Sequence, residues 1–310
     1  MDSTQLPDRG NPWPRVTIIT PSFNQGGFIE ETIRSVLLQR YPNLEYLLLD
    51  GGSTDGTLEI VKKYEHWIDF WVTGPDGGQS AAINRGLHMG TGAYATWINS
   101  DDLLCRDALS QHFATRELPA ADTFYVGDCE VVDREGRLLF TQRGRVHCLE
   151  DLVRIRTVWK SGGYISQPAV LFPRQFATQV GGLNVENYYS MDYELWGRFF
   201  LAGGKACYTG LPFGCFRHHE AQKTADLAKQ TVSTLDVATA LLAQANSIDP
   251  SRKQDLVNDL EEYGRQHPDI LWKSSGRLAR LGLPPLLVTP VRRFKRMVER
   301  KFSTLRHSRT

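Results

Sequence analysis

Cysteine is scarce in this chain of 310 residues, and the few cysteines follow none of the familiar functional spacings. Their number is odd, they lie far apart, and no CxxC pair occurs among Cys105, Cys129, Cys148, Cys207 and Cys215. This pattern argues against a disulfide framework and against a zinc site. A reducing compartment is the simplest location for such a chain.

Long apolar runs and an excess of charge are also missing. No stretch approaches the roughly 20 apolar residues of a membrane-spanning helix, and the polar, proline-rich start lacks the apolar segment of a signal peptide. The formal net charge is only +1, without the basic excess typical of nucleic-acid binding. We therefore expect a cytoplasmic globular protein with no nucleic-acid partner, long enough to bury a large core.

Short apolar runs alternate with amphipathic helical patterns over the first hundred residues. The runs predict four strands, and the patterns between them predict three helices. The strands are expected at 16–20, 45–50, 70–73 and 93–99, and the helices at 28–39, 57–64 and 79–89. Such alternation is typical of βαβ units. We expect an α/β fold with a mostly parallel, twisted sheet flanked by helices.

Beyond residue 110 the pattern loosens. We expect a hairpin from 124–132 and 137–141, an irregular segment at 143–166, a strand at 169–172, a helix at 190–202, and helices from about 224 onward. The predicted divisions of the chain are an N-terminal leader at 1–13, a catalytic domain at 14–225 and a helical C-terminal extension at 226–310.

Polar residues follow all four early strands, and carboxylates follow three of them. Asp50 ends the second strand, Asp76 follows the third, and Asp101 and Asp102 follow the fourth. In a parallel sheet these ends share one edge, where ligands bind. Turn preference alone explains a single aspartate. Two adjacent carboxylates repel unless a cation lies between them, so Mg²⁺ or Mn²⁺ with diphosphate oxygens is expected here.

Seven segments, taken in order, resemble family 2 glycosyltransferases, which have the GT-A fold. They are VTIITPSFN (16–24), LDGGSTDGT (49–57), DGGQSAAINRG (76–86), GAYATWINSDD (92–102), SQPAVLF (166–172), MDYELWGR (191–198) and FRHHEAQKT (216–224). Each motif is weak alone, but the ordered set is specific. The resemblance implies metal-dependent, inverting transfer of a sugar from a UDP- or dTDP-type donor to an acceptor hydroxyl.

The same resemblance implies roles for particular residues. Asp50 is expected to hold the nucleotide, and His219 to bind the divalent cation together with Asp101 or Asp102. Asn99 stands where the family has its first acid, so which aspartate touches the metal stays open. The other expected nucleotide-sugar contacts lie at the strand ends and on the helix after the third strand: Thr20, Pro21, Ser22, Asn24, Asp76, Gln79, Asn84, Asn99 and Asp101.

Asp192 is the expected catalytic base, since it matches the acid of the family's ED-like motif. Met191 replaces the usual glutamate. A base must reach the acceptor hydroxyl directly, whereas an aspartate at a helix start is also explained by the helix dipole. Glu194 is the second candidate, although it faces another side of the helix.

Several other residues in these motifs and nearby are open to two interpretations, one functional and one structural. His218 and His219 are adjacent, and imidazole suits Mn²⁺ better than Mg²⁺. Arg217 and Lys223 either neutralise diphosphate oxygens or form a solvated face. Trp159 and Tyr164 either stack on an acceptor sugar or belong to the core.

Two other functions share parts of this pattern. A nicotinamide-dependent dehydrogenase would use the same sheet, but it needs GxGxxG after the first strand, and the turn here reads SFNQGG. A catalytically silent sugar-nucleotide or glycan-binding module is consistent with Met191, whereas the retained Asp192 argues against it.

The end of the chain is strongly basic. From residue 273 onward there are eleven Lys or Arg and one acidic residue, Glu299. Residues 286–305 predict a basic amphipathic helix, which either lies on an anionic membrane or packs on the catalytic domain. The expected partners are a nucleotide-sugar donor and a sugar or lipid-linked glycan acceptor. They suit bacterial cell-surface polysaccharide or glycolipid synthesis at the inner face of the cell membrane.

Overall fold

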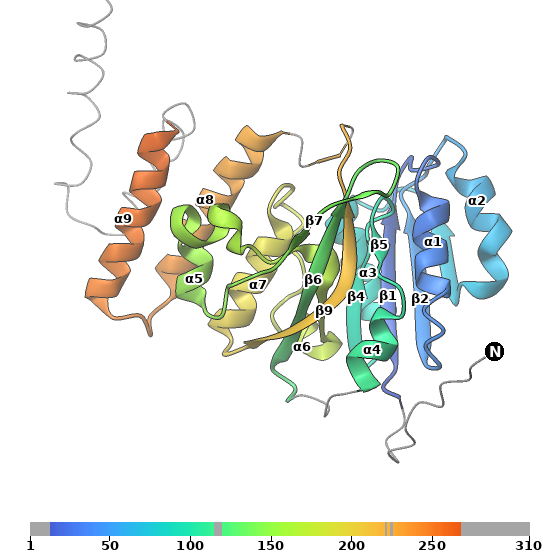
Figure 1. The fold of residues 1–310 in the computed structure, drawn as a ribbon, viewed down its shortest axis with the longest axis horizontal. Helices are drawn as coiled ribbons and strands as arrows, with labels where there is room; N and C mark the ends of the chain where they lie inside the picture. Colours follow the sequence, from blue (N-terminus) through green and yellow to red (C-terminus); the bar gives the residue numbers. More distant parts are fainter. Residues whose placement is uncertain (1–12, 115–119, 221, 224–225, 268–310) are drawn as a thin grey trace, which may run out of the picture.

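One mixed sheet organises the chain in the computed structural model, which describes residues 13–114, 120–220, 222–223 and 226–267. Among these residues the strand order is β3-β2-β1-β4-β8-β6-β9-β5, with β7 beside β6 (Figure 1). The strands are β1 (Val16–Ser22), β2 (Leu44–Asp50), β3 (Phe70–Thr73), β4 (Tyr94–Trp97), β5 (Leu103–Leu104), β6 (Thr123–Val132), β7 (Leu138–Gln142), β8 (Val170–Pro173) and β9 (Lys205–Arg217).

The first four strands are parallel, as predicted: β1 pairs with β2 and β4, and β2 pairs with β3. All of β1 is buried, which is typical of a strand covered on both faces. On one face α1 (Ile29–Leu37) and α2 (Thr57–Tyr64) pack on Ile18 and Leu48. On the other face α3 (Gln79–Met89) packs on Ile19 and Leu47. The period of two along each strand therefore divides the core into two layers.

The second half of the sheet differs from the expectation in two places. The hairpin of β6 and β7 is confirmed. The long strand β9, parallel to β6, was not predicted. The segment 143–166 is not irregular, because α5 (Leu149–Val153) and a wide helical turn (Ile155–Gly163) occupy it. Both are short, and Gly162 with φ of 88° interrupts the second, so no helical period was visible in the sequence.

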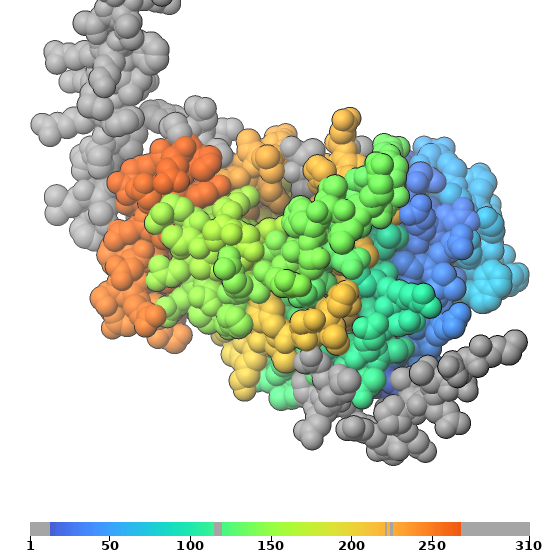
Figure 2. Space-filling view, in the orientation of Figure 1, coloured from blue at the N-terminus to red at the C-terminus, as the bar shows by residue number. Residues whose placement is uncertain are grey.

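Apart from two 3₁₀ turns, Glu65–Trp67 and Gln167–Ala169, five further α-helices remain in the described chain. Two are short, α4 (Ala108–Ala114) and α6 (Arg174–Gln179), and three are longer, α7 (Met191–Leu201), α8 (Leu227–Gln244) and α9 (Pro250–Gln266). In the space-filling view α9 forms one end of the molecule and α2 the other (Figure 2). Leu241 and Leu256 of the extension share one hydrophobic cluster with Trp196 and Phe199. The described part of the extension therefore packs on the core of the sheet.

The helices predicted after residue 224 are confirmed as far as residue 267. Both α8 and α9 begin with an aspartate whose side chain accepts backbone N–H groups, Asp226 and Asp249. The predicted leader, except for residue 13, and the predicted basic helix at 286–305 lie outside the described residues. Within those residues, the model has no helix with the length and apolar content that a bilayer span requires.

The contact between α7 and α8 predicts that one glycine-to-alanine substitution in a helix lowers the stability of the protein instead of raising it. A Cβ at Gly197 would lie 2.2 Å from Leu241 Cδ1. In an open helix, Gly→Ala stabilises by about 1 kcal/mol. We expect Gly197→Ala instead to destabilise the protein by about 1–3 kcal/mol through overpacking, measured by urea unfolding. Gly56→Ala is the control, because no atom lies within 4 Å of its Cβ position. Equal stability of the two variants would contradict this contact.

Candidate active site

Asp50 holds together the loop that follows β2. Its carboxylate accepts the backbone N–H groups of Gly52 at 3.0 Å and Ser53 at 2.8 Å, as well as the Thr73 hydroxyl at 2.7 Å. The Ser53 hydroxyl donates to it too. Asp50 is 1% exposed. The carboxylate therefore shapes the loop on which a nucleotide would lie, and its oxygens face the protein.

The loops after β1 and β2 are joined to each other. The N–H of Asn24 donates to Ser53 Oγ at 2.7 Å, and the N–H of Thr54 donates to Asn24 Oδ1 at 2.8 Å. Asn24 has a φ of 52°, which asparagine tolerates better than most residues. Asn24 is exposed and lies at the edge where the sequence placed it.

The residues predicted on β1 divide into two groups. Thr20 and Pro21 are buried within the sheet, and Thr20 Oγ1 accepts the Tyr46 hydroxyl at 3.2 Å. Both side chains are enclosed by the protein, and the contact of these two residues with the donor stays a prediction. Ser22 Oγ is buried without a hydrogen-bond partner among the described residues, so it is a polar group that a ligand or water can satisfy.

Asp76 lies over the Asp50 loop. Its carboxylate accepts the N–H of Gly78 at 2.7 Å. A Cβ at Gly51 would lie 3.2 Å from Asp76 Oδ2, so glycine at position 51 leaves the space that this carboxylate fills. Asp76 is half-buried and, unlike Asp50, has an oxygen without a hydrogen bond among the described residues.

Asn84 makes a structural contact with the loop before α7, and its predicted contact with the donor stays a prediction. Its amide donates to the carbonyl of Leu183 and accepts the N–H of the same residue, each at 2.7 Å. A Cβ at Gly182 would come within 2.5 Å of Asn84 Oδ1. Asn84 therefore fastens α3 to the loop before α7, and its polar atoms are occupied by that contact.

Gln79 and Asn99 connect the two halves of the site. Gln79 donates to Asn99 Oδ1 at 2.7 Å and accepts Lys223 Nζ at 2.9 Å. Asn99 Nδ2 in turn donates to Asp102 Oδ2 and to Gln167 Oε1, each at 3.1 Å. Both predicted residues belong to a chain of hydrogen bonds that runs from Lys223 to Asp102.

Asp101 and His219 meet, as the resemblance implied. Asp101 Oδ2 lies 3.1 Å from His219 Nε2. The His219 ring packs on Phe28, with centroids 4.5 Å apart, and its Nδ1 is buried without a partner among the described residues. His218 is exposed. Of the two adjacent histidines, only His219 faces the site.

Asp102 lies one layer deeper than Asp101. It is 2% exposed, and it accepts the backbone N–H of Arg217 at 3.0 Å and the amide of Asn99 at 3.1 Å. Burial raises its pKa well above the usual range, and the neighbouring Asp101 raises it further. Both of its oxygens are engaged, so the geometry favours Asp101 over Asp102 for direct contact with an ion.

Arg217 belongs to the framework of the site. Its guanidinium, with the side chain 1% exposed, donates to the carbonyls of Asp101 at 3.0 Å and Arg134 at 2.8 Å and pairs with Glu31. It lies over the Phe28 ring. The interpretation as a solvated face is wrong, because the side chain is 1% exposed. Each of the three guanidinium nitrogens already donates to a protein oxygen, and the diphosphate contact stays a prediction.

A divalent cation fits the Asp101–His219 pair. Two ligand atoms at right angles on an octahedral ion, each about 2.1 Å from it, are about 3.0 Å apart. The observed separation of Asp101 Oδ2 and His219 Nε2 is 3.1 Å. Asp101 is half-buried, so its carboxylate is partly accessible from outside. This oxygen and nitrogen donor pair suits Mn²⁺.

Asp192 lies in the first turn of α7. Its Oδ1 accepts the N–H of Tyr193 at 2.8 Å. It does not cap the helix, which begins at Met191 and whose N-cap residue, Ser190, makes no side-chain capping bond. Burial raises its pKa, while the Tyr193 N–H and Lys223 lower it. Met191 packs against Ser80 Oγ at 2.8 Å, so the residue that replaces the family's glutamate joins α7 to α3.

Glu194 faces away from this region. Its carboxylate accepts the amides of Asn184 at 3.2 Å and Asn187 at 2.7 Å. It lines a separate cavity of about 610 Å³ between α8 and the loop before α7. As a candidate base it is therefore less well placed than Asp192.

Lys223 lies between Gln79 and Asp192. Burial lowers its pKa to about 8, and Asp192 opposes that shift. Its ammonium lies 3.8 Å from the centroid of the Tyr188 ring, and Tyr188 is 61% exposed. The sequence analysis missed Tyr188. The only indication in the sequence was a pair of adjacent tyrosines, Tyr188 and Tyr189, just before the predicted helix. Trp159, by contrast, is half-buried and packs against the core, with its ring centroid 4.6 Å from that of Tyr193. Tyr164 is half-buried beside it, with ring centroids 6.1 Å apart.

The parallel first half, the long β9 and the polar edge of the sheet together define the GT-A fold. Residues 17–146 match the model of the glycosyl transferase family 2, so this region of the chain is similar to that family. A relative named as a teichuronic acid biosynthesis glycosyltransferase, TuaG of Bacillus subtilis (strain 168), is 37% identical over 101 residues, 32% of this chain and 40% of its own. The chain spans between 28% and 59% of the length of the curated relatives that it matches.

Two solved structures show the same fold. S. aureus TarS 1-349 in complex with UDP-GlcNAc superposes with a TM-score of 0.61 and 15% identity, over 81% of this chain and 72% of that one. The mannosyltransferase PcManGT from Pyrobaculum calidifontis, in complex with GDP-Man and Mn²⁺, gives a TM-score of 0.55 and 19% identity, over 89% and 80% of the two chains. The predicted fold class is confirmed.

The role of Arg217 can be tested by stability. We expect Arg217→Lys to lower the free energy of unfolding by about 3 kcal/mol, because a single ammonium leaves buried carbonyls without donors. Arg137→Lys is the matched control. Arg137 is 74% exposed and pairs with Asp133 and Glu135, so its loss of pairing costs about 0–1 kcal/mol. Unfolding in guanidinium chloride measures the stability of both variants. Equal losses of unfolding free energy would contradict a framework role for Arg217.

Proposed function

We propose that this protein is a metal-dependent, inverting glycosyltransferase that transfers a hexosyl group from a nucleotide-diphosphate sugar to an acceptor hydroxyl. One observation carries the proposal. A continuous chain of contacts runs from Lys223 through Gln79 and Asn99 to Asp102. It links the candidate base, which interacts electrostatically with Lys223, to the candidate metal pair. One polar network thus joins the residues proposed to act on the acceptor to those proposed to act on the leaving group.

The donor lies across the carboxyl ends of β1, β2 and β4. Asp50 fixes the loop that receives the nucleoside, and Asp76, Ser22 and Asn24 are the polar groups available beside it. A nucleoside with a free imide N–H, as in UDP or dTDP, donates well to the open oxygen of Asp76. UDP-GlcNAc and GDP-Man are the ligands of the two structures compared above, which supports a nucleotide-sugar donor.

Asp101 and His219 hold the divalent cation, with Asp102 positioning both the Asp101 segment and Arg217. When bound, the ion neutralises the charge that develops on the departing diphosphate. The Mn²⁺ in the PcManGT complex supports a cation of this kind. Lys223, with its ammonium directed to Gln79, adds a second positive charge beside the diphosphate.

Asp192 accepts the proton of the acceptor hydroxyl. Burial raises the pKa of Asp192, which makes it a stronger base than an exposed aspartate, and Lys223 opposes that rise. A single attack from the face opposite the leaving group inverts the anomeric carbon. Tyr188 provides an exposed ring beside Lys223, and such a ring is suited to stack on the acceptor sugar.

The acceptor belongs to a bacterial cell-surface polysaccharide or glycolipid in this proposal. The name of TuaG, with its reference to teichuronic acid biosynthesis, supports a polymeric acceptor. The basic segment at 286–305, read from its sequence, would bring the enzyme to a lipid-linked acceptor at an anionic membrane.

The base assignment predicts a kinetic effect without a binding effect. Asp192→Asn is expected to lower turnover by about 10²–10⁴-fold, because proton removal is lost, while UDP binding measured by calorimetry stays unchanged. The assay is release of UDP from a panel of UDP-sugars without added acceptor. Glu194→Gln is the matched control and should keep turnover. Unchanged turnover in Asp192→Asn would refute the assignment. A wild-type protein that binds a donor without hydrolysing it would instead favour the silent binding module.

The metal pair predicts a graded effect on binding. Asp101→Asn and His219→Gln should each weaken Mn²⁺-dependent UDP binding by at least about tenfold, since each removes a ligand, and Asp102→Asn by about 10–100-fold through loss of its orienting contacts. Asp133→Asn, in the exposed β6–β7 turn, is the control. Full activity of the wild-type enzyme in excess chelator would refute a divalent requirement.

A further inference from the structure

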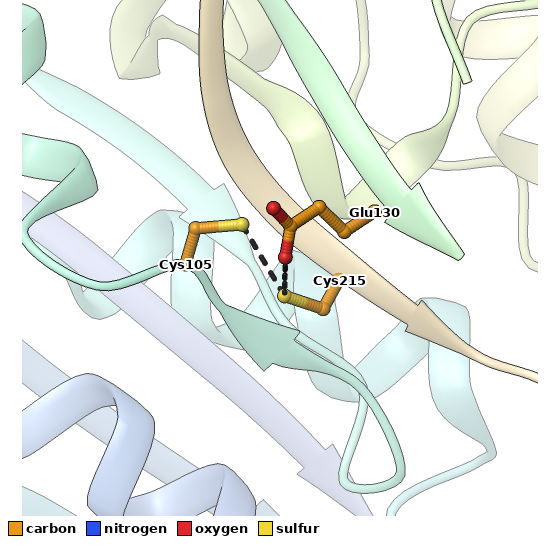
Figure 3. Close-up of side chains that lie close together, drawn as sticks. All are labelled: Cys105, Glu130 and Cys215. Atoms are coloured by element: carbon orange, nitrogen blue, oxygen red, sulfur yellow. Dashed lines mark hydrogen bonds between the residues drawn. The ribbon is translucent and has the colours of Figure 1, made fainter. Parts of the chain in front are cut away.

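Three side chains from neighbouring strands converge on one face of the sheet: Cys105, Glu130 and Cys215 (Figure 3). The two sulfur atoms are 3.2 Å apart. Cys215 Sγ is 3.8 Å from Glu130 Oε2. All three possible ligand atoms lie within 4.8 Å of one another.

Strand register brings these residues together. Glu130 on β6 stands opposite Cys215 on β9, and Leu103 on β5 stands opposite Cys215 from the other side. Cys105 follows Leu103 by two residues, so its side chain returns to the same face. The N–H of Cys105 donates to the Phe213 carbonyl at 2.9 Å, which fixes the end of β5 against β9.

Glu130 lacks the cationic partner that its neighbour has. Two residues earlier on β6, Asp128 pairs with Arg143 at 2.8 Å. Among the described residues Glu130 has no ion pair, and its one hydrogen-bond donor is the Cys215 thiol. Glu130 is half-buried, and the two cysteines are each 7% exposed. A half-buried carboxylate beside two thiols is an incompletely compensated group that a cation would satisfy.

We propose that Cys105, Glu130 and Cys215 form a binding site for a soft divalent cation such as Zn²⁺. Two sulfurs bound at 2.3 Å to a tetrahedral zinc are about 3.8 Å apart, so the thiols need to separate by about half an ångström. The thiols lose their protons to solvent as the ion binds. Water takes the fourth position from the accessible side of Glu130.

This site differs from the Asp101–His219 pair in chemistry and in consequence. Two sulfur ligands select Zn²⁺ or Cd²⁺ over Mg²⁺ and Mn²⁺. Cys105 follows Asp102 by three residues, and Cys215 precedes Arg217 by two. An ion between the cysteines therefore ties β5 to β9, the two strands adjoining the candidate active site, and should stabilise both against thermal unfolding.

The test is a titration of the reduced full-length protein with Cd²⁺ in excess Mg²⁺. We expect one Cd²⁺ per chain, with the ultraviolet absorption that a cadmium–thiolate bond produces, and competition by Zn²⁺. Cys105→Ser and Cys215→Ser should each abolish this absorption, and Glu130→Gln should weaken binding at least about tenfold. Cys148→Ser, an exposed cysteine elsewhere, is the matched control and should leave both unchanged.

A second readout does not depend on the folding of variants. In the wild-type chain, Zn²⁺ should protect Cys105 and Cys215 from alkylation, located by peptide mass spectrometry, while Cys148 stays reactive. Three outcomes would overturn the proposal. They are absent thiolate absorption, equal binding by the serine variants, and a Cys105–Cys215 disulfide whose reduced form takes up no cadmium.

Discussion

The guanidinium of Arg217 lies buried where β9 ends, and three other segments of the chain contact it. It holds the carbonyl of Asp101, the carbonyl of Arg134 in the β6–β7 turn, and Glu31 on α1, while its own N–H holds Asp102. A buried charge is tolerated only when its hydrogen bonds are satisfied. The chain is therefore obliged to bring these segments together, and that obligation places Asp101 against His219.

The amide network depends on this arrangement. With Asp102 fixed by Arg217, Asn99 has one orientation that satisfies both Asp102 and Gln167. Gln79 is then directed to Lys223, whose pKa falls to about 8 because it is largely removed from water. Burial has the largest effect on both groups, raising the pKa of Asp192 and lowering that of Lys223, and each charge opposes the shift of the other. The network that begins at β9 thus ends beside the candidate base.

The same pairing of β9 produces the cysteine cluster. β9 lies between β6 and β5, so Cys215 has neighbours on both sides, Glu130 and the end of β5. One strand thus links the two candidate metal sites. His219 of the first site lies just beyond the end of β9, and Cys215 of the second lies within it. A ligand at either place acts on a strand that both share.

The sequence by itself determined the parallel half of the fold, because strands buried on both faces appear as apolar runs between helices with a clear period. Asp101, Asp192 and His219 were also accessible from the sequence, since each lies in a motif that follows a strand or opens a helix. Only the tertiary structure decided which of the polar residues in these motifs have their side-chain atoms occupied by other parts of the protein. Arg217, Asn84 and Asp50 turn their polar groups to the protein, and burial is set by neighbours distant along the chain. Strand β9 escaped the sequence analysis for the same reason. The wide spacing of the cysteines argued against a zinc site, so the Cys105–Glu130–Cys215 cluster was visible only in the fold. Their partners are joined by register across the sheet, and register leaves no regular spacing along the chain.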